Sequence, residues 1–268
     1  MKRGMGSPVG RVEDERFVTG AGRFTDDIDL PGQAHAVLVR SSQAHARLRR
    51  VSTAAAQAAP GVLGVLTAGD LADDGVGTLP CQYVIANRDG SPQALPPRPA
   101  LAQERVRHVG EAIALVVAKT LAEARDAAEL VEVDYEPLPT VTDLARALEP
   151  DAPQLHAEAP GNLVLDYEAG DEAAVERLFA SAHRIVSLDL VNNRVLANPI
   201  EPRAAIGDFD PATGRYTLTT GNQGAFVLRN MIAEEVLKVD RARLRVVTPD
   251  VGGSFGMKIG RASCRERV

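Results

Sequence analysis

The chain has 268 residues, enough for one large domain or two ordinary ones, and its 45% hydrophobic content supports a packed core. Its net charge is -6 and its lysines and arginines are scattered among acidic residues, so no basic stripe predicts a nucleic-acid partner. The sequence shows neither a secretory leader nor a membrane span, and Cys81 and Cys264 suggest no disulfide or metal site, so we expect a cytoplasmic protein.

The first half of the chain predicts strands and one helix. Three short apolar runs predict strands, at residues 34–40, 61–67 and 111–118, and the polar loop after the first indicates a hairpin-like entry into a sheet. Thr120 begins a helix, because its hydroxyl can accept from an early helical N–H while Glu123 reaches back to the cap. Residues 131–135 alternate like a strand. This order favours a right-handed crossover between parallel strands, with antiparallel pairing as the alternative.

The second half repeats the alternation of helices and strands after a Pro-rich stretch. Residues 139–162 contain four prolines and little periodicity, which indicates a domain boundary. Apolar residues share one helix face in residues 171–182, and residues 184–191 predict a strand. A turn, a strand, an amphipathic helix and another strand follow, at residues 209–214, 216–220, 224–237 and 244–248.

Two polar, glycine-containing loops, residues 221–224 and 249–258, follow the last two strands. If these strands are parallel and joined by the helix between them, both loops open on the same sheet edge, where ligands collect. Gln223 would stand at the positive end of that helix, suited to an anionic oxygen, and the close glycines would let backbone N–H groups approach a ligand. Either loop could equally be an ordinary turn, and a glutamine before a helix commonly caps it.

Other residues are weaker candidates for a catalytic or metal-binding role. The five histidines are not spaced like metal ligands, and no Ser or Cys lies on a strand-to-helix elbow as a nucleophile would. Lys258 follows Met257 rather than a glycine, which excludes a phosphate-binding loop. Glu201, between Pro199 and Pro202, is expected to be structural rather than a general base.

In this order the motifs resemble the large subunits of the xanthine dehydrogenase and aerobic carbon monoxide dehydrogenase family. GRVEDERFVTGAGRFTDDIDLPGQAHAVLVRSSQAHARL, GEAIALVVA and AAELVEVDYEPLP are similar to its α/β hammerhead domain, whereas NNRVLANPIEPRAAIGDFDPATGRYTL and VLKVDRARLRVVTPDVGGSFGMK resemble the start of its molybdopterin-binding domain. The resemblance implies an α+β fold with an N-terminal extension (1–19), a hammerhead domain (20–138), a Pro-rich linker (139–162) and the first part of the molybdopterin-binding domain (163–258).

The resemblance also implies an activity and a cofactor. The full-length protein would be an oxidoreductase that hydroxylates an aldehyde, an N-heterocycle or CO with oxygen from water, using a molybdenum–molybdopterin cofactor in its cytosine dinucleotide form. Gln223 corresponds to the glutamine that hydrogen-bonds an oxygen ligand of molybdenum. The loop that lines the metal, with no direct metal ligand, corresponds to Gly252, Gly253, Phe255 and Gly256. Ser254 departs from the pattern, because the family more commonly has a third glycine there.

Partners are implied because the chain lacks the cysteines of an iron–sulfur domain. They are a [2Fe–2S] small subunit and an FAD-binding medium subunit, in a dimer of heterotrimers acting on a small molecule. The catalytic glutamate is expected beyond Lys258, so the chain is expected to be an inactive N-terminal fragment. Residues 259–268 show no family likeness and are expected to be translated sequencing adapter, with a natural divergent terminus as the alternative. The rival to an enzyme is a non-enzymatic two-domain α/β binding module.

Overall fold

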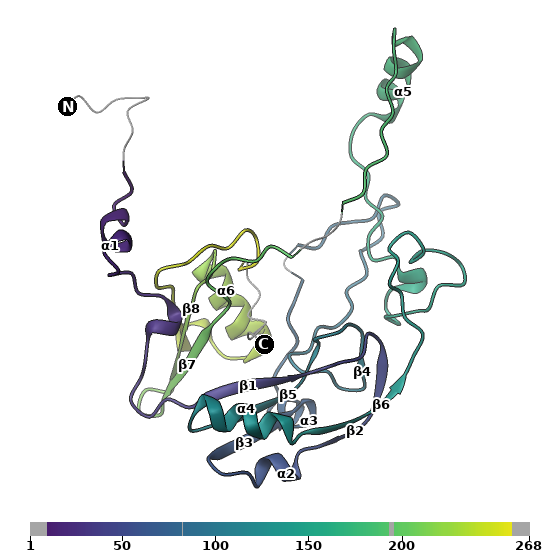
Figure 1. Ribbon diagram of the computed structural model, residues 1–268. Coiled ribbons are helices and arrows are strands. Elements are labelled where there is room, and N and C mark those ends of the chain that lie inside the picture. The colour runs from purple at the N-terminus through teal and green to yellow at the C-terminus, as the bar shows by residue number, and fades with distance from the viewer. Residues whose placement is uncertain (1–9, 82, 193–195, 259–268) are drawn as a thin grey trace, which may run out of the picture. The chain divides into compact units, whose positions relative to one another are not determined.

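The computed structural model describes residues 10–81, 83–192 and 196–258 (Figure 1). Two compact units divide these residues: one runs from His35 to Leu196, and the other joins the segment before it to the segment after it. The predictions for residues 1–9 and for the tail 259–268 lie outside the described residues. The first part of the predicted hammerhead domain, residues 20–34, thus shares a unit with the two glycine loops.

The unit from His35 to Leu196 contains two sheets that each have three described strands. Its elements are β1 (His35–Arg40), β2 (Ala46–Ser52), α2 (Ala54–Gln57), β3 (Val62–Thr67), α3 (Ala68–Asp73), β4 (Arg105–Val106), β5 (Ala112–Ala118), α4 (Leu121–Glu129), β6 (Glu132–Pro137), η2 (Pro160–Asn162) and α5 (Glu172–Ser181). One sheet has the order β1-β5-β3 and the other β4-β2-β6, and all neighbours are antiparallel (Figure 1). The strands predicted at residues 34–40, 61–67, 111–118 and 131–135 are confirmed as β1, β3, β5 and β6.

Two predictions about pairing in this unit are wrong. The run from β5 through α4 to β6 forms no parallel crossover, because β5 and β6 lie in different sheets. The loop after β1 closes no hairpin, because β1 pairs with β5 whereas β2 pairs with β6. The physical reason is burial: β5 is apolar throughout and takes the centre of a sheet, with Ile113, Ala114 and Val116 buried, whereas β6 alternates and suits a sheet with one exposed face.

Helix α4 packs against β1 and β5, and Thr120 determines where it begins. The Thr120 hydroxyl accepts from the Glu123 N–H at 3.2 Å, which confirms the predicted cap. It also donates to the Glu123 carboxylate at 2.9 Å, so this carboxylate bonds the hydroxyl of the cap residue. The cap fixes the helix so that Ala124 and Ala127 are fully buried.

Thr120→Ala is expected to lower the free energy of unfolding of the chain by about 1 kcal/mol, because the Glu123 N–H loses its acceptor. Thr120→Ser keeps the hydroxyl and is the matched control. Urea denaturation followed by circular dichroism measures both variants. An equal loss for the two variants, or no loss for Thr120→Ala, would show that the hydroxyl does not stabilise the helix.

The segment after the Pro-rich stretch begins in this same unit. The N–H of Arg88 donates to the Asp166 carbonyl at 2.7 Å, and the N–H of Ala94 donates to the Val164 carbonyl at 2.9 Å. The Arg88 guanidinium also pairs with Asp166 and Glu168, at 3.0 and 3.2 Å. Residues 163–168, placed by the sequence in the molybdopterin-binding domain, therefore lie against the loop that contains Arg88.

A half-buried histidine gives this unit a pH dependence. The Nδ1 of His156 is buried and has no hydrogen-bond partner within the described part of the chain. Burial, and then the charge of Arg107, lower the pKa of His156 below its ordinary value of 6.5. Below pH 6.5 the unfolded chain therefore binds this proton more readily than the folded chain, and stability that is fully present above 6.5 is lost as the pH falls.

His156→Gln is expected to flatten the pH dependence of the unfolding free energy between about pH 7 and pH 5 relative to the parent chain. Urea denaturation at a series of pH values measures the slope for both proteins. His108→Gln, at an exposed histidine, is the matched control and should leave the slope unchanged. Parallel curves for His156→Gln and the parent would contradict a lowered pKa at this position.

Near the end of this unit one predicted element is confirmed and the next is wrong. Helix α5 matches the predicted residues 171–182, and its cap Asp171 accepts from the Ala174 N–H at 2.9 Å. Its apolar side chains are not covered, however, and Leu178 is 70% exposed. Residues 184–191 are exposed and form no strand. A strand needs a neighbour for its backbone groups, and none pairs with this segment among the described residues.

The other unit carries the two glycine loops. Its elements are α1 (Asp14–Val18), η1 (Thr25–Asp27), β7 (Ala205–Asp210), β8 (Arg215–Thr220), α6 (Ala225–Met231), the π-helical turn η3 (Ile232–Val236), η4 (Arg241–Arg243) and β9 (Leu244–Val247). β7 and β8 form an antiparallel hairpin (Figure 1). β8 and β9 are parallel, and α6 lies between them in sequence. The turn, strands and helix predicted between residues 209 and 248 are confirmed. No helix among the described residues could cross a membrane.

Candidate functional site

The two glycine loops leave neighbouring strands at the same end. β8 and β9 pair in parallel with Thr219 opposite Val247, so both strands point toward the same edge of the sheet. The loop 221–224 follows β8 directly and the loop 249–258 follows β9 after one residue. The arrangement that the sequence left conditional on parallel pairing is therefore present, at the edge where such sheets bind ligands.

Gln223 and Ser254 join the two loops. The Ser254 hydroxyl donates to the Gln223 Oε1, and the Gln223 backbone N–H donates to the Lys258 carbonyl at 3.1 Å. The Ser254 Oγ also accepts from the Lys258 N–H at 3.2 Å. With its Oε1 engaged, the exposed Gln223 keeps its amide NH₂ as a donor, for which the described residues supply no partner.

The second loop contains three left-handed residues. Gly253 and Gly256 have φ of 99° and 82°, which glycine adopts at little cost, but Phe255 also has a positive φ, of 49°. The Phe255 side chain is 79% exposed. Ser254 is not among the described non-glycine residues with positive φ, so a serine is accommodated at this position without backbone strain.

Glu201 lies against the same loop. Its Oε2 accepts from the Gly252 N–H at 2.7 Å and pairs with the Lys258 ammonium, and both side chains are largely buried. A Cβ on Gly252 would lie 2.5 Å from the Glu201 Cβ, so glycine is required there by packing against Glu201. The prediction that Glu201 is structural agrees with these contacts. The sequence did not indicate its partners; the flanking prolines are the only local signal.

Four further contacts tie the loops to the rest of the unit. Asp250 accepts from the Arg23 N–H at 2.8 Å and pairs with the Arg16 guanidinium. These two hydrogen bonds, Arg16 first, hold the pKa of Asp250 below its ordinary 3.8. Arg203 Nε donates to the Met257 carbonyl at 2.8 Å, and the Asn222 amide donates to Thr248 Oγ1 at 2.6 Å.

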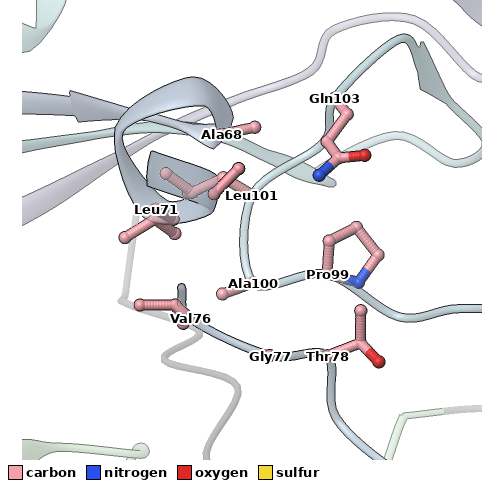
Figure 2. Close-up of a pocket in the computed structure, with 10 residues that line it drawn as sticks. Ala68, Leu71, Val76, Gly77, Thr78, Pro99, Ala100, Leu101 and Gln103 are labelled. Atoms are coloured by element: carbon pink, nitrogen blue, oxygen red, sulfur yellow. The ribbon is translucent and has the colours of Figure 1, made fainter. Parts of the chain in front are cut away.

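A small pocket lies in the unit from His35 to Leu196, away from the two glycine loops in sequence. It lies between α3 and the segments 76–78 and 99–103, and its labelled side chains are mostly apolar (Figure 2). None of the predicted site residues lines it.

The loops offer hydrogen-bond donation and a shaped surface rather than proton transfer. Glu201 and Lys258 are paired with each other, and Asp250 is paired with Arg16. What is presented is the Gln223 amide, the backbone of the glycine-rich loop and the exposed ring of Phe255. Such a surface suits a large ligand that carries oxygen acceptors.

Comparisons with known proteins match both halves of the chain. Residues 19–139 match the family described as aldehyde oxidase and xanthine dehydrogenase, a/b hammerhead domain, and residues 155–266 match the molybdopterin cofactor-binding domain. The chain is 38% identical to the carbon monoxide dehydrogenase large chain of Afipia carboxidovorans, over 96% of its length, and 35% identical to the nicotine 6-hydroxylase large subunit of Paenarthrobacter nicotinovorans, over 95%. It spans 32% and 30% of those proteins, about a third of their length.

Solved structures give the same result. A crystal structure of Cu,Mo-CO dehydrogenase matches 97% of the chain with a TM-score of 0.81 and 37% identity, and the match covers 33% of that protein chain. Quinoline 2-oxidoreductase from Pseudomonas putida 86 matches 96% with a TM-score of 0.81 and 36% identity, covering 32%. The expected α+β fold, a hammerhead domain followed by part of a molybdopterin-binding domain, is confirmed.

Proposed function

Because the chain belongs to the molybdopterin-binding large subunits of the xanthine dehydrogenase and aldehyde oxidase family, we propose that the complete subunit is a molybdenum-dependent oxidoreductase. Its reaction would hydroxylate an aldehyde or an N-heterocycle, or oxidise CO, with oxygen from water. The relatives that support this range are named for carbon monoxide, nicotine and xanthine.

The observation that carries the proposal is the junction of the two loops at one sheet edge. Gln223 from the first loop bonds Ser254 and Lys258 of the second, so the residues assigned by resemblance to the cofactor meet in one place. A pair of unrelated turns would not need this cross-link. The junction favours a binding site over the alternative that each loop is an ordinary turn.

The residues present fit the implied cofactor. The Gln223 amide retains a donor for an oxygen of the group. At Gly256 no atom lies within 4 Å of the position that a Cβ would take, so a ligand could approach the backbone there. We assign Gly252, Gly253, Phe255 and Gly256 to lining the molybdopterin cofactor and Gln223 to hydrogen-bonding one of its oxygens. The cofactor supplies the oxidation–reduction chemistry when bound. The chain then orients the cofactor, and the general base is expected from a segment outside this chain.

The same proposal includes the cytosine dinucleotide form of the cofactor and two partner subunits. One partner would be an iron–sulfur small subunit and the other an FAD-binding medium subunit, in a cytoplasmic dimer of heterotrimers. Relatives named as a large chain, a large subunit and a subunit gamma of a complex support partners in general. Electrons would leave through these partners.

Metal analysis and a substrate screen of the complete complex test the proposal. The full-length gene is expressed with its neighbouring genes, molybdenum is measured by mass spectrometry, and aldehydes, N-heterocycles and CO are assayed with a dye as electron acceptor. About one molybdenum per large subunit and turnover of one substrate class are expected. A correctly folded complex with no molybdenum would overturn the proposed function.

A further inference from the structure

A buried ion pair lies directly against the candidate cofactor loop. The side chains of Lys258 and Glu201 are 1% and 10% exposed, whereas those of the ion pair between Arg241 and Glu234 are 58% and 46% exposed. Burying two charges costs free energy that only close pairing and additional hydrogen bonds can offset. Glu201 has such a bond, because its Oε2 also accepts from the Gly252 N–H at 2.7 Å.

This geometry joins the two ends of the loop through one carboxylate. Gly252 lies at the start of the segment 252–258 and Lys258 at its end, and both bind the Glu201 Oε2. The Glu201 backbone N–H also donates to the Gly252 carbonyl, at 3.4 Å. Ser254, Phe255 and the positive-φ glycines lie between the two fixed points.

We propose that Glu201 and Lys258 are positioning residues, which clamp the segment 252–258 in its cofactor-binding conformation before the cofactor arrives. The role of the loop rests on the proposed function, but the clamp consists of contacts within this chain. Its contribution is preorganisation, because a loop fixed in advance loses less conformational freedom when it binds.

Hydrogen exchange in the cofactor-free complete subunit, produced in a host unable to make the cofactor, tests the clamp. Glu201→Gln keeps a hydrogen-bond acceptor near Gly252 but leaves Lys258 without its charge partner. The amides of 252–258 should exchange at least about tenfold faster, whereas those of β8 and β9 stay within about twofold, because the effect is local. The matched control, Glu234→Gln at the exposed pair, should change neither.

A second variant separates the clamp from a loss of folding. Glu201→Gln combined with Lys258→Met removes both charges, so no uncompensated charge remains buried and the slow exchange of the loop should be partly restored. Unchanged exchange in Glu201→Gln, or an equal increase in β8 and β9, would overturn the positioning role.

Molybdenum content in a host that makes the cofactor completes the test. Glu201→Gln should carry at least about fivefold less molybdenum than the parent complex, because the open loop must be ordered on binding. Equal loading despite fast local exchange would show that the clamp does not serve the cofactor. If the parent complex itself carries no molybdenum, the proposed function fails, and the exchange rates still decide whether the clamp orders the loop.

Discussion

Gln223→Ala in the complete enzyme should lower kcat by about 100-fold or more while leaving the molybdenum content near that of the parent. The Gln223 amide has its oxygen bound to Ser254 and its NH₂ available to an acceptor on the cofactor. A preorganised donor of this kind acts on the charge that develops during the reaction, and it contributes little to holding a large cofactor that many contacts bind.

Steady-state kinetics normalised to molybdenum measure this effect. Gln57→Ala, at an exposed glutamine of α2, is the matched control and should leave kcat unchanged. Full molybdenum content with full turnover in Gln223→Ala would show that the residue does not have the role assigned to it.

Gly252→Ala should lower the free energy of unfolding by about 1–3 kcal/mol, the usual cost of inserting a methyl group where there is no space. The added Cβ would lie 2.5 Å from the Glu201 Cβ and 3.5 Å from the Glu201 backbone nitrogen. Because Glu201 is held by Lys258, it cannot move aside without breaking the buried ion pair. The variant should also bind less molybdenum.

Gly207→Ala is the matched control for this prediction. It lies in β7 of the same unit, and its Cβ would meet nothing within 4 Å. Chemical denaturation of the chain and molybdenum analysis of the complex compare the two variants. A neutral Gly252→Ala, or equal losses at both glycines, would contradict the packing described for the loop.

Local patterns predicted the elements of the site better than their surroundings. The strand–helix–strand run from β8 through α6 to β9 lies within one short stretch of chain, so its elements followed from periodicity, whereas the parallel pairing of β8 and β9 remained a condition that the structure meets. The contacts that fix the loops come from distant segments. Arg23 and Asp250, for example, are separated by 227 residues, and no local pattern marks such a partner.

The pairing of strands in the unit from His35 to Leu196 could not be predicted for a similar reason. β2 has the sequence ARLRRVS, which lacks an apolar run and was not predicted as a strand. It pairs with β4 and β6 and buries Ala46 against Val106 and Ile113, whereas the exposed Arg47 and Arg49 pair with Glu136 on β6. The residues that make it a strand are thus far from it in sequence.

Anomalous diffraction at the molybdenum edge, from crystals of the complete complex, tests the central claim most directly. If the two loops line the cofactor site, the molybdenum peak lies beside the Gln223 amide and the segment 252–256. A molybdenum peak bordered by neither loop would contradict this account.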